Sequence, residues 1–426
     1  MEASNEGMLS PYRVLDLTED RSYICGKVLG DLGADVIKIE KPGGDRGRNL
    51  GPFYQDIPHP ERSLYWLGFN TSKRGITLNL ETADGQELFK KLVQKADIVI
   101  ESYPVGYLDR IGLGYQVLSQ INPGLILASI SGFGQEGPYR DLKAPEIVIW
   151  ALAGEAYMTG DADRAPLYPS FPIVYSFAGT QAAIGILVAL YQRGITGEGQ
   201  QIDIPAFLGI AWASGPEMQG LWALDKTLIK RTGGIWARAQ TSETGEVSYI
   251  NIPLIYPCKN GGVKFFPFVE EGMLPSTDGL TRWVIEEGFA SETLKKLEWR
   301  TWNWQAARQE IVDDITGCFR RFFLSHTKAE LWEGARKRGI QSSPLFTAED
   351  ILSFPQLQAR EYWQKVEYSY LGTSLTYPGA FAKLAQGSCA LRRRAPRIGE
   401  HNAEIYTGEL GLSPGELVEL RQANVI

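Results

Sequence analysis

Apolar residues in the first 134 positions alternate between short continuous runs and stretches with helical spacing. Runs at 13–17, 35–40, 75–82, 97–102 and 125–134 predict strands. The stretches at 83–96 and 114–123, and the segment that carries Val28, Leu29 and Leu32, have the spacing of amphipathic helices. Strands that alternate with helices of this length predict an α/β fold with a parallel sheet covered on both faces.

The alternation weakens after about residue 218 and resumes in a different form near the C-terminus. The run 249–268 predicts a hairpin that turns at Asn260, Gly261 and Gly262. Helices are expected again at 328–339 and 413–423. We therefore expect a large domain from 1–218, a smaller α+β domain from 219–330, and a return segment, 331–426, that completes the large domain.

Composition limits the classes of function open to the chain. Among 426 residues the formal net charge is −7, and acidic and basic residues are interspersed, which speaks against nucleic acid as the main partner. The first residues lack the basic start and apolar run of a signal peptide, and no continuous run of about 18 apolar residues predicts a membrane span. We expect a cytoplasmic protein without a membrane partner.

Cysteine and histidine usage argues against a metal centre or a disulfide framework. The four cysteines are far apart and predict buried free thiols: Cys25, Cys258, Cys318 and Cys389. The three histidines stand apart from one another and from acidic clusters: His59, His326 and His401. No GxSxG elbow precedes a helix, which disfavours a serine hydrolase.

Three loops that follow predicted strands are rich in glycine and basic residues. They span Glu40–Arg48, Glu101–Arg110 and Ser131–Lys143. Ligands of parallel sheets gather at the carboxyl ends of strands, glycine lets the backbone approach a ligand closely, and lysine or arginine neutralises anions. Basic loops in an acidic protein therefore predict a local anionic ligand.

The chain resembles the family III CoA-transferases, which include carnitine CoA-transferase, formyl-CoA transferase and α-methylacyl-CoA racemase. The motifs that carry the resemblance run in order from residue 14 to residue 413: VLDLT, LGADVIKIEKPGGD, NTSKRGITLNL, ADIVIESYPVGYLDRIGLGY, INPGLILASISGFGQEGPYRD, TGEGQQIDI, LQAREYW and IGEHNAEIYTGELGLS. The middle domain is weakly covered.

The resemblance implies a Rossmann-like large domain built from both chain ends and two subunits interlocked like linked rings. It also implies that coenzyme A, as free CoA or acyl-CoA substrate, lies on the large domain, with no permanently bound cofactor. Lys41 matches a basic position near the ribose phosphate. The other expected CoA-binding residues lie at the strand ends and basic loops: Lys73, Arg74, Tyr103, Arg110 and Lys143.

One position departs from the family pattern. In the family's transferases an aspartate, four residues before a glycine, attacks the thioester and becomes a mixed anhydride. Counting back from Gly179 reaches Tyr175, and a slip of one residue reaches Ser176; neither can replace the carboxylate. The racemase pair of histidine and aspartate matches Pro145 and Tyr175, and neither is a base near pH 7.

Three functions remain open from the sequence. The first is the non-catalytic subunit of a heteromeric CoA-transferase whose homologous partner keeps the aspartate, as in the succinyl-CoA:(R)-benzylsuccinate CoA-transferase of anaerobic toluene breakdown. The second is an active homodimeric transferase with a displaced acid such as Glu146; the third is a CoA-ester binding protein without chemistry. Arg21 stands where the family often has glutamine, and an aromatic acceptor acid would suit a pocket of aromatic side chains: Tyr157, Tyr168, Phe171 and Tyr175.

Overall fold

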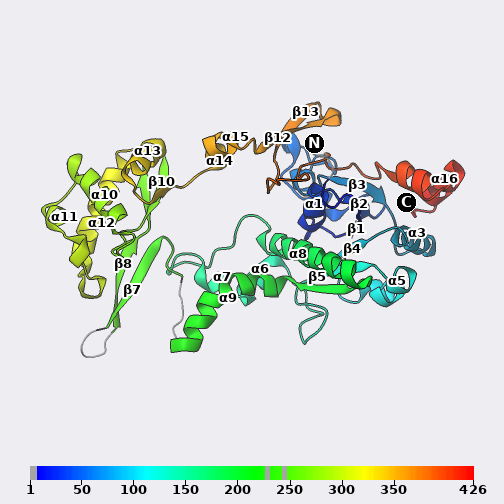
Figure 1. Ribbon diagram of the computed structural model, residues 1–426, viewed down its shortest axis with the longest axis horizontal. Helices are drawn as coiled ribbons and strands as arrows, with labels where there is room; N and C mark the ends of the chain where they lie inside the picture. Colours follow the sequence, from blue (N-terminus) through cyan, green and yellow to red (C-terminus); the bar gives the residue numbers. More distant parts are fainter. Residues whose placement is uncertain (1–6, 226–230, 242–246) are drawn as a thin grey trace. The chain divides into compact units, whose positions relative to one another are not determined.

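The computed structural model describes residues 7–225, 231–241 and 247–426, and the chain divides into two units (Figure 1). Unit 1 contains residues up to 156, 168–228 and 355–426; unit 2 contains 157–167 and 229–354. The resemblance implies that both chain ends belong to one large domain, and unit 1 contains both the N-terminal and the C-terminal segments. The return to unit 1 comes at Pro355 instead of residue 331, because α13 (Lys328–Arg338) and β11 (Ser342–Pro344) pack on the small sheet of unit 2.

A six-stranded parallel sheet forms the centre of unit 1, in the order β3-β2-β1-β4-β5-β6. This is the strand order of a Rossmann-type doubly wound sheet. Its strands are β1 (Arg13–Leu17), β2 (Asp35–Glu40), β3 (Lys73–Thr77), β4 (Ile98–Glu101), β5 (Ile126–Ser131) and β6 (Gln201–Pro205). The order reverses between β1 and β4, so the crevice that such sheets use for ligands lies at the ends of these two strands.

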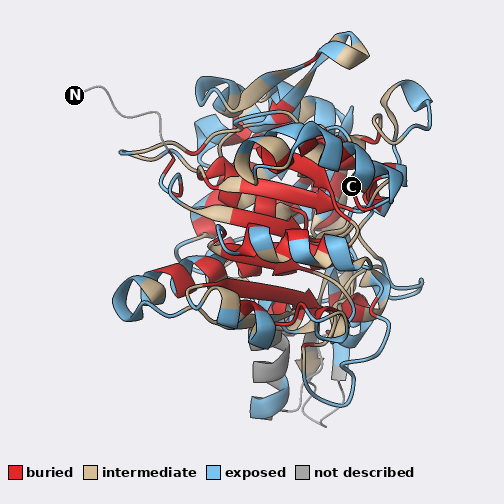
Figure 2. Ribbon diagram, turned by 90° about the vertical axis from the view of Figure 1, so that its right-hand side faces the viewer, coloured by how far each residue is buried: buried red, intermediate tan, exposed pale blue. Residues whose placement is uncertain are grey.

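Alternate residues of the strands face two separate cores. Figure 2 shows the strands of the sheet as buried. Val14 and Ile98 face the core that α1 (Ile24–Asp31) and α8 (Ile173–Thr196) cover. Leu15 and Val99 face the core beneath α3 (Ala83–Val93). Burial on both faces explains why these strands are continuous apolar runs in the sequence.

The other helices of unit 1 are mostly short. They are α2 (Leu64–Phe69), α4 (Tyr107–Arg110), α5 (Tyr115–Ile121), α6 (Glu146–Leu152), α7 (Glu155–Met158, which crosses into unit 2), α9 (Ala206–Asp225), α15 (Pro355–Ala359) and α16 (Pro414–Gln422). A hairpin of β12 (Trp363–Tyr368) and β13 (Thr373–Pro378) precedes α16. The α8 helix has the length and composition of a membrane span, but half of its apolar stretch is buried, as in a core helix.

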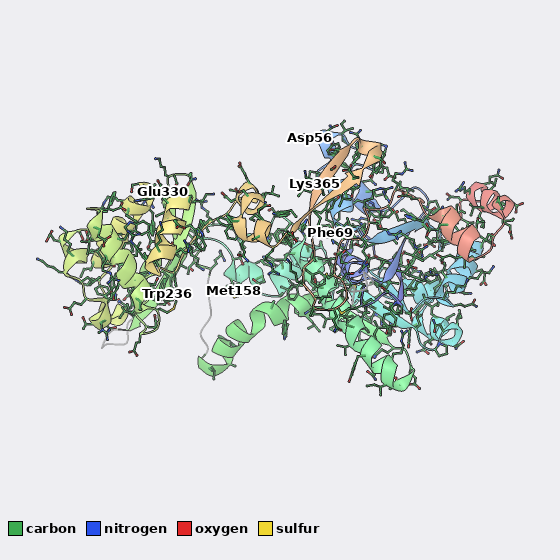
Figure 3. All side chains as sticks on the ribbon, turned by 45° about the horizontal axis from the view of Figure 1, so that its top comes forward. Asp56, Phe69, Met158, Trp236, Glu330 and Lys365 are labelled. Carbon is green, nitrogen blue, oxygen red and sulfur yellow. The ribbon has the colours of Figure 1, made fainter. Side chains whose placement is uncertain are left out.

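Unit 2 is an α+β body with its own core, as the weakened alternation after residue 218 predicted. Its strands are β7 (Ile235–Thr241), β8 (Val247–Pro253), β9 (Ile255–Cys258), β10 (Gly261–Phe265) and β11. Its helices are α10 (Leu274–Glu286), α11 (Glu292–Lys296), α12 (Gln309–Leu324), α13 and α14 (Ala348–Ser353). In Figure 3, Trp236 marks β7, where its ring packs edge-on against Phe266, and Glu330 marks the capped start of α13.

The predicted hairpin at 249–268 is correct in its second half only. Strands β9 and β10 pair antiparallel, with Cys258 opposite Gly261, so the turn is at Lys259 and Asn260. Residues 249–253 belong to β8, which pairs with β7 instead. The four cysteines are buried free thiols, as predicted.

Candidate active site

Two adjoining cavities occupy the crevice at the carboxyl ends of β1 and β4. Four residues line both: Glu19, Arg46, Tyr103 and Pro104. Glu19 follows β1 and Tyr103 follows β4, so the reversal of strand order brings these loops together. The crevice therefore matches the place where the sequence predicted an anionic ligand.

The first cavity, about 370 Å³ in volume, lies beside the loop that follows β2. Exposed Lys41 and half-buried Tyr103 both line it, so the structure brings these two predicted residues together. The Tyr103 and Tyr107 rings lie 4.7 Å apart between centroids, and the Arg110 guanidinium lies 5.3 Å from the Tyr107 ring centre. Arg110 is exposed on α4 next to this wall and does not line the cavity itself.

The second cavity, about 670 Å³, extends from Tyr103 to the start of α8. Exposed Lys143, from the loop that follows β5, lines it. Three arginines from three different loops also line it: Arg21, Arg46 and Arg140. The cavity is therefore rich in basic side chains.

Lys73 and Arg74 do not belong to these cavities. The strand β3 begins at Lys73 instead of Gly75, which places both side chains at the amino end of the sheet, opposite the crevice. The Lys73 ammonium is fully buried and contacts Asp16 at 2.8 Å, and it also donates to the Tyr23 carbonyl and the Asn70 side chain. These contacts take up its three N–H groups, so a phosphate contact by Lys73 is not supported.

Arg74 has an equally complete set of partners. Its guanidinium pairs with Asp35 at 2.6 Å, Glu404 at 2.7 Å and Glu409 at 2.6 Å. Two of these acids come from the C-terminal segment of the chain. Arg74 therefore ties the chain's end to the sheet, which is a structural role in place of the expected CoA contact.

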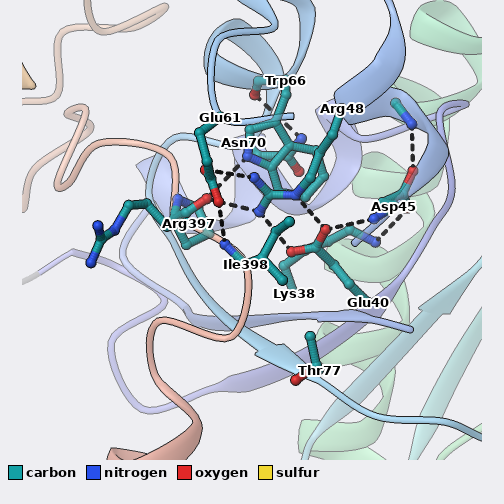
Figure 4. A network of polar contacts seen from close by, with 12 residues as sticks. Lys38, Glu40, Asp45, Arg48, Glu61, Trp66, Asn70, Thr77, Arg397 and Ile398 are labelled. Carbon is teal, nitrogen blue, oxygen red and sulfur yellow. Dashed lines mark hydrogen bonds and ion pairs between the residues drawn. The ribbon is translucent and has the colours of Figure 1, made fainter. Parts of the chain in front are cut away.

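A buried network fixes the loop that carries Lys41 and Arg46 (Figure 4). Arg48 has no exposed surface. Its guanidinium donates to both carboxylate oxygens of Glu40, at 2.6 and 2.7 Å, and to the Glu61 carboxylate at 3.0 Å. Its guanidinium also lies 3.7 Å from the centre of the Trp66 ring. Charge-assisted bidentate pairs of this kind are strong and directional. The sequence grouped Arg48 with the anion-binding residues of its loop, whereas the structure shows it as the loop's anchor.

Tyr175, in the first turn of α8, is 2% exposed. Its hydroxyl donates to the Ala144 carbonyl at 2.7 Å and accepts from Arg21 at 3.2 Å. Burial raises the pKa of Tyr175, although the neighbouring Arg21 acts in the opposite direction. The side chain is thus a neutral phenol at the floor of the second cavity, where it can hold a guanidinium but cannot act as a base or a carboxylate nucleophile.

Glu146, the alternative acid, is occupied elsewhere. One of its carboxylate oxygens accepts from the Tyr175 backbone N–H at 3.1 Å, and the other accepts from the Tyr168 hydroxyl. It does not line the second cavity, although its neighbours Ala144 and Pro145 do. Glu146 therefore caps one of the free N–H groups at the start of α8, where a negative charge is favoured.

The proposed aromatic pocket is not assembled in unit 1. Of its members there, only Tyr175 lines the cavity. Tyr168 packs edge-on against Trp150, with 6.0 Å between ring centres, and Phe171 is 60% exposed. Tyr157 belongs to unit 2. In addition, no group of three or more potential metal ligands occurs among the residues that the structure describes.

Comparison with known proteins decides the family. The model of CoA-transferase family III matches residues 9–402. The chain belongs to this family. The resemblance drawn from the sequence motifs is thereby confirmed, and the chain is a transferase of the CoA-transferase type in its ancestry and fold.

Relatives in family III have several substrates. The chain is 32% identical to succinyl-CoA:(R)-benzylsuccinate CoA-transferase subunit BbsE of Thauera aromatica, with 98% of each chain covered. It is 32% identical to succinyl-CoA–D-citramalate CoA-transferase of Chloroflexus aurantiacus, with 94% of each covered. It is 31% identical to formyl-CoA:oxalate CoA-transferase of Streptomyces avermitilis, covering 98% of this chain and 99% of the relative.

A solved structure of a CaiB/BaiF family protein from Brucella suis has the same fold. It superposes with a TM-score of 0.78 at 26% sequence identity, covering 95% of this chain and 99% of that chain. The predicted α/β fold class with a Rossmann-like sheet is therefore confirmed.

Proposed function

We propose that this chain is the non-catalytic subunit of a heteromeric family III CoA-transferase. The complex transfers CoA from an acyl-CoA, for which we propose succinyl-CoA, to an organic acid such as (R)-benzylsuccinate. A homologous subunit carries the nucleophilic aspartate. The observation that carries the proposal is Tyr175, which takes the expected place of that aspartate with a buried, neutral side chain.

The chemistry of the reaction explains why the residue at this position determines whether a subunit can be catalytic. A carboxylate nucleophile can form a mixed anhydride with the acyl group, accept CoA as a thioester and pass it to a second acid. A phenol would form an aryl ester, which cannot carry CoA between two acids. Arg21 beside Tyr175 further favours an anionic ligand over a nucleophile at this point.

The relatives support a partner subunit. BbsE is named as one subunit of its enzyme, and another relative, 29% identical, is the beta subunit of succinyl-CoA–L-malate CoA-transferase from Chloroflexus aurantiacus. The outer face of α8 is apolar and exposed. Its exposed side chains are Ile184 (58%), Val188 (61%), Tyr191 (75%) and Ile195 (72%). An apolar stripe of this length suits a subunit contact, and we propose that it packs against the partner in an interlocked dimer or tetramer.

For CoA binding we propose the exposed cations around the two cavities. Lys41 would neutralise the ribose phosphate, Arg110 and Lys143 would contact further phosphate or acyl groups, and Tyr103 would form the wall between the cavities. We leave Lys73 and Arg74 out of this set because their donors are already used. No cofactor beyond CoA and its esters is proposed, and the cytoplasm remains the proposed location.

An active homomeric transferase that uses Glu146 is the alternative. The relatives include formyl-CoA:oxalate CoA-transferases, which are not named as subunits of a larger enzyme, so a homomeric transferase is the second candidate for this chain. Both Glu146 oxygens are engaged at the start of α8, away from the cavity wall, which disfavours attack on a thioester there.

Co-expression tests the proposal. The chain would be produced alone and together with a homologous family III subunit that carries the aspartate, and each preparation would be assayed for CoA transfer from succinyl-CoA. We expect a stable complex with turnover and no turnover from the chain alone. Turnover by the purified single chain would favour the homomeric alternative, and CoA binding without a partner or turnover would favour a CoA-ester binding protein.

A further inference from the structure

The charges around the second cavity are not evenly balanced. Arg46 pairs with Asp20 at 3.1 Å, and Arg140 pairs with Asp141 at 3.4 Å. A third acid, Glu19, also lines the cavity, and burial, with help from nearby carboxylates, raises its pKa. Two of the four basic residues that line the cavity are thus already compensated.

Arg21 is different. It donates one N–H to the Tyr175 hydroxyl, and its guanidinium lies 4.9 Å from the centre of the Tyr175 ring. Within the described part of the chain it forms no ion pair with a carboxylate, although Asp20, the partner of Arg46 on the same cavity wall, interacts with its charge at longer range. Lys143, at the exposed mouth, is likewise without an acidic partner among the described residues. The floor of the cavity therefore holds a half-buried cation that a ligand anion can pair with.

The geometry around Arg21 suits a carboxylate. A guanidinium presents five N–H donors in a planar fork that matches the two oxygens of a carboxylate. The Tyr175 hydroxyl uses its own hydrogen on the Ala144 carbonyl, so its oxygen is left to accept from Arg21. Tyr175 thereby orients the guanidinium and leaves most of its donors for a ligand.

We propose that the cavity at Arg21 is a carboxylate subsite, in which Arg21 binds the free carboxylate of a short dicarboxylic acid and Tyr175 is the positioning residue. The proposal rests on the proposed function, since it gives the altered site of the non-catalytic subunit a ligand. The carboxylate can belong to the free acid or to its CoA monothioester. The volume of about 670 Å³, adjoining the cavity of Lys41, has room for the acyl end of a thioester.

Two stable thioethers of equal chain length test the subsite. S-(3-carboxypropyl)-CoA ends in a carboxylate, and S-butyl-CoA ends in a methyl group. Binding of each to the full chain, and of succinate alone, would be measured by titration calorimetry. We expect the carboxylate probe to bind about tenfold more tightly than the butyl probe, the size of one charge-assisted contact. Succinate binding with no thioether preference would identify the free acid as the ligand.

Three variants separate Arg21 from general charge effects. In Arg21→Gln the carboxylate preference and any succinate binding should disappear. Arg140→Gln, which removes the same charge from the same cavity but from an exposed residue paired with Asp141, should keep the preference. Tyr175→Phe should reduce it only partly, because the ligand contact remains while the orienting acceptor is lost. Thermal melts would confirm that each variant is folded.

The proposal is overturned if the wild type binds both thioethers equally and does not bind succinate, or if Arg21→Gln keeps the preference. These measurements need no turnover, so a failure of the subsite proposal can be told apart from a failure of the proposed function. A chain that catalyses transfer alone would refute the non-catalytic assignment and leave the affinity ratio unaffected.

Discussion

Replacing Lys73 by methionine tests whether this residue is structural. Its ammonium is fully buried and pairs with the equally buried Asp16 at 2.8 Å. Burial alone would raise the pKa of Asp16, but Lys73 and Lys38 outweigh burial and lower it. In Lys73→Met, Asp16 would keep only the more distant Lys38, at 4.0 Å, and its hydrogen bonds from Thr18.

The expected cost follows from leaving a buried charge without its partner. Removing one member of a buried ion pair typically costs about 3–5 kcal/mol, whereas removing both members costs much less. Lys73→Met should therefore lower the free energy of unfolding by about 3–5 kcal/mol. The loss should be smaller at pH 5 than at pH 8, because the orphaned Asp16 can take up a proton as the pH falls.

Urea unfolding followed by circular dichroism measures this loss. Lys41→Met is the matched control, because it removes the same group from an exposed position and should change stability by less than about 0.5 kcal/mol. The double variant Asp16→Asn with Lys73→Met should recover part of the loss. A cost below about 1 kcal/mol for Lys73→Met, together with weaker CoA binding, would show that Lys73 is a ligand after all.

Three further predictions concern other residues. Burial raises the pKa of Glu101 to about 7, partly opposed by hydrogen bonds from Ser129 and the Tyr103 N–H. The free energy of unfolding of the wild type should therefore fall as the pH rises from about 4.5 through 7, because unfolding releases the proton that folded Glu101 holds. In urea titrations, the stability of Glu101→Gln relative to the wild type should increase between pH 5 and pH 8 by on the order of 3 kcal/mol. Glu146→Ala should cost about 1 kcal/mol of stability as a lost helix cap while turnover of the co-expressed complex stays within twofold; abolished turnover would indicate a catalytic acid. Lys41→Gln should weaken CoA binding about fivefold at low salt but leave binding of dephospho-CoA, which lacks the ribose phosphate, unchanged; an equal loss for both ligands would place Lys41 elsewhere.

Five of the six strands of the sheet were predictable because their physics is local, whereas the less buried edge strand β6 was not predicted. Strands buried on both faces, such as Ile98–Glu101, are apolar for most of their length, and the helices between them show their spacing directly. The elements of unit 2 were harder to predict. Helix α10 buries serine, threonine and glycine beside its apolar residues, and β7 pairs with a strand that the sequence assigned to the neighbouring hairpin. Helix α12, in contrast, has regular amphipathic spacing that could have been predicted.

The candidate site was predictable in its position but only partly in its residues. Strand ends and basic loops pointed to the crevice whose cavities Lys41, Tyr103 and Lys143 line, and their role in CoA binding stays a prediction. Sequence cannot show whether a basic side chain points out or in. Both Lys73 and Arg48 point into buried networks: Lys73 pairs with Asp16, 57 residues away, and Arg48 pairs with Glu40, 8 residues away. Arg21 was noticed only as a departure from the family pattern. Its position against Tyr175, 154 residues away, depends on the folded sheet.

Locating the covalent acyl intermediate tests the central claim most directly. The co-expressed complex would be incubated with succinyl-CoA, quenched with hydroxylamine or borohydride, and both subunits digested for mass spectrometry. We predict the modified residue to be an aspartate of the homologous partner, with no modified acid in this chain. A modified carboxylate on this chain, whether Glu146 or any other acid, would contradict the account.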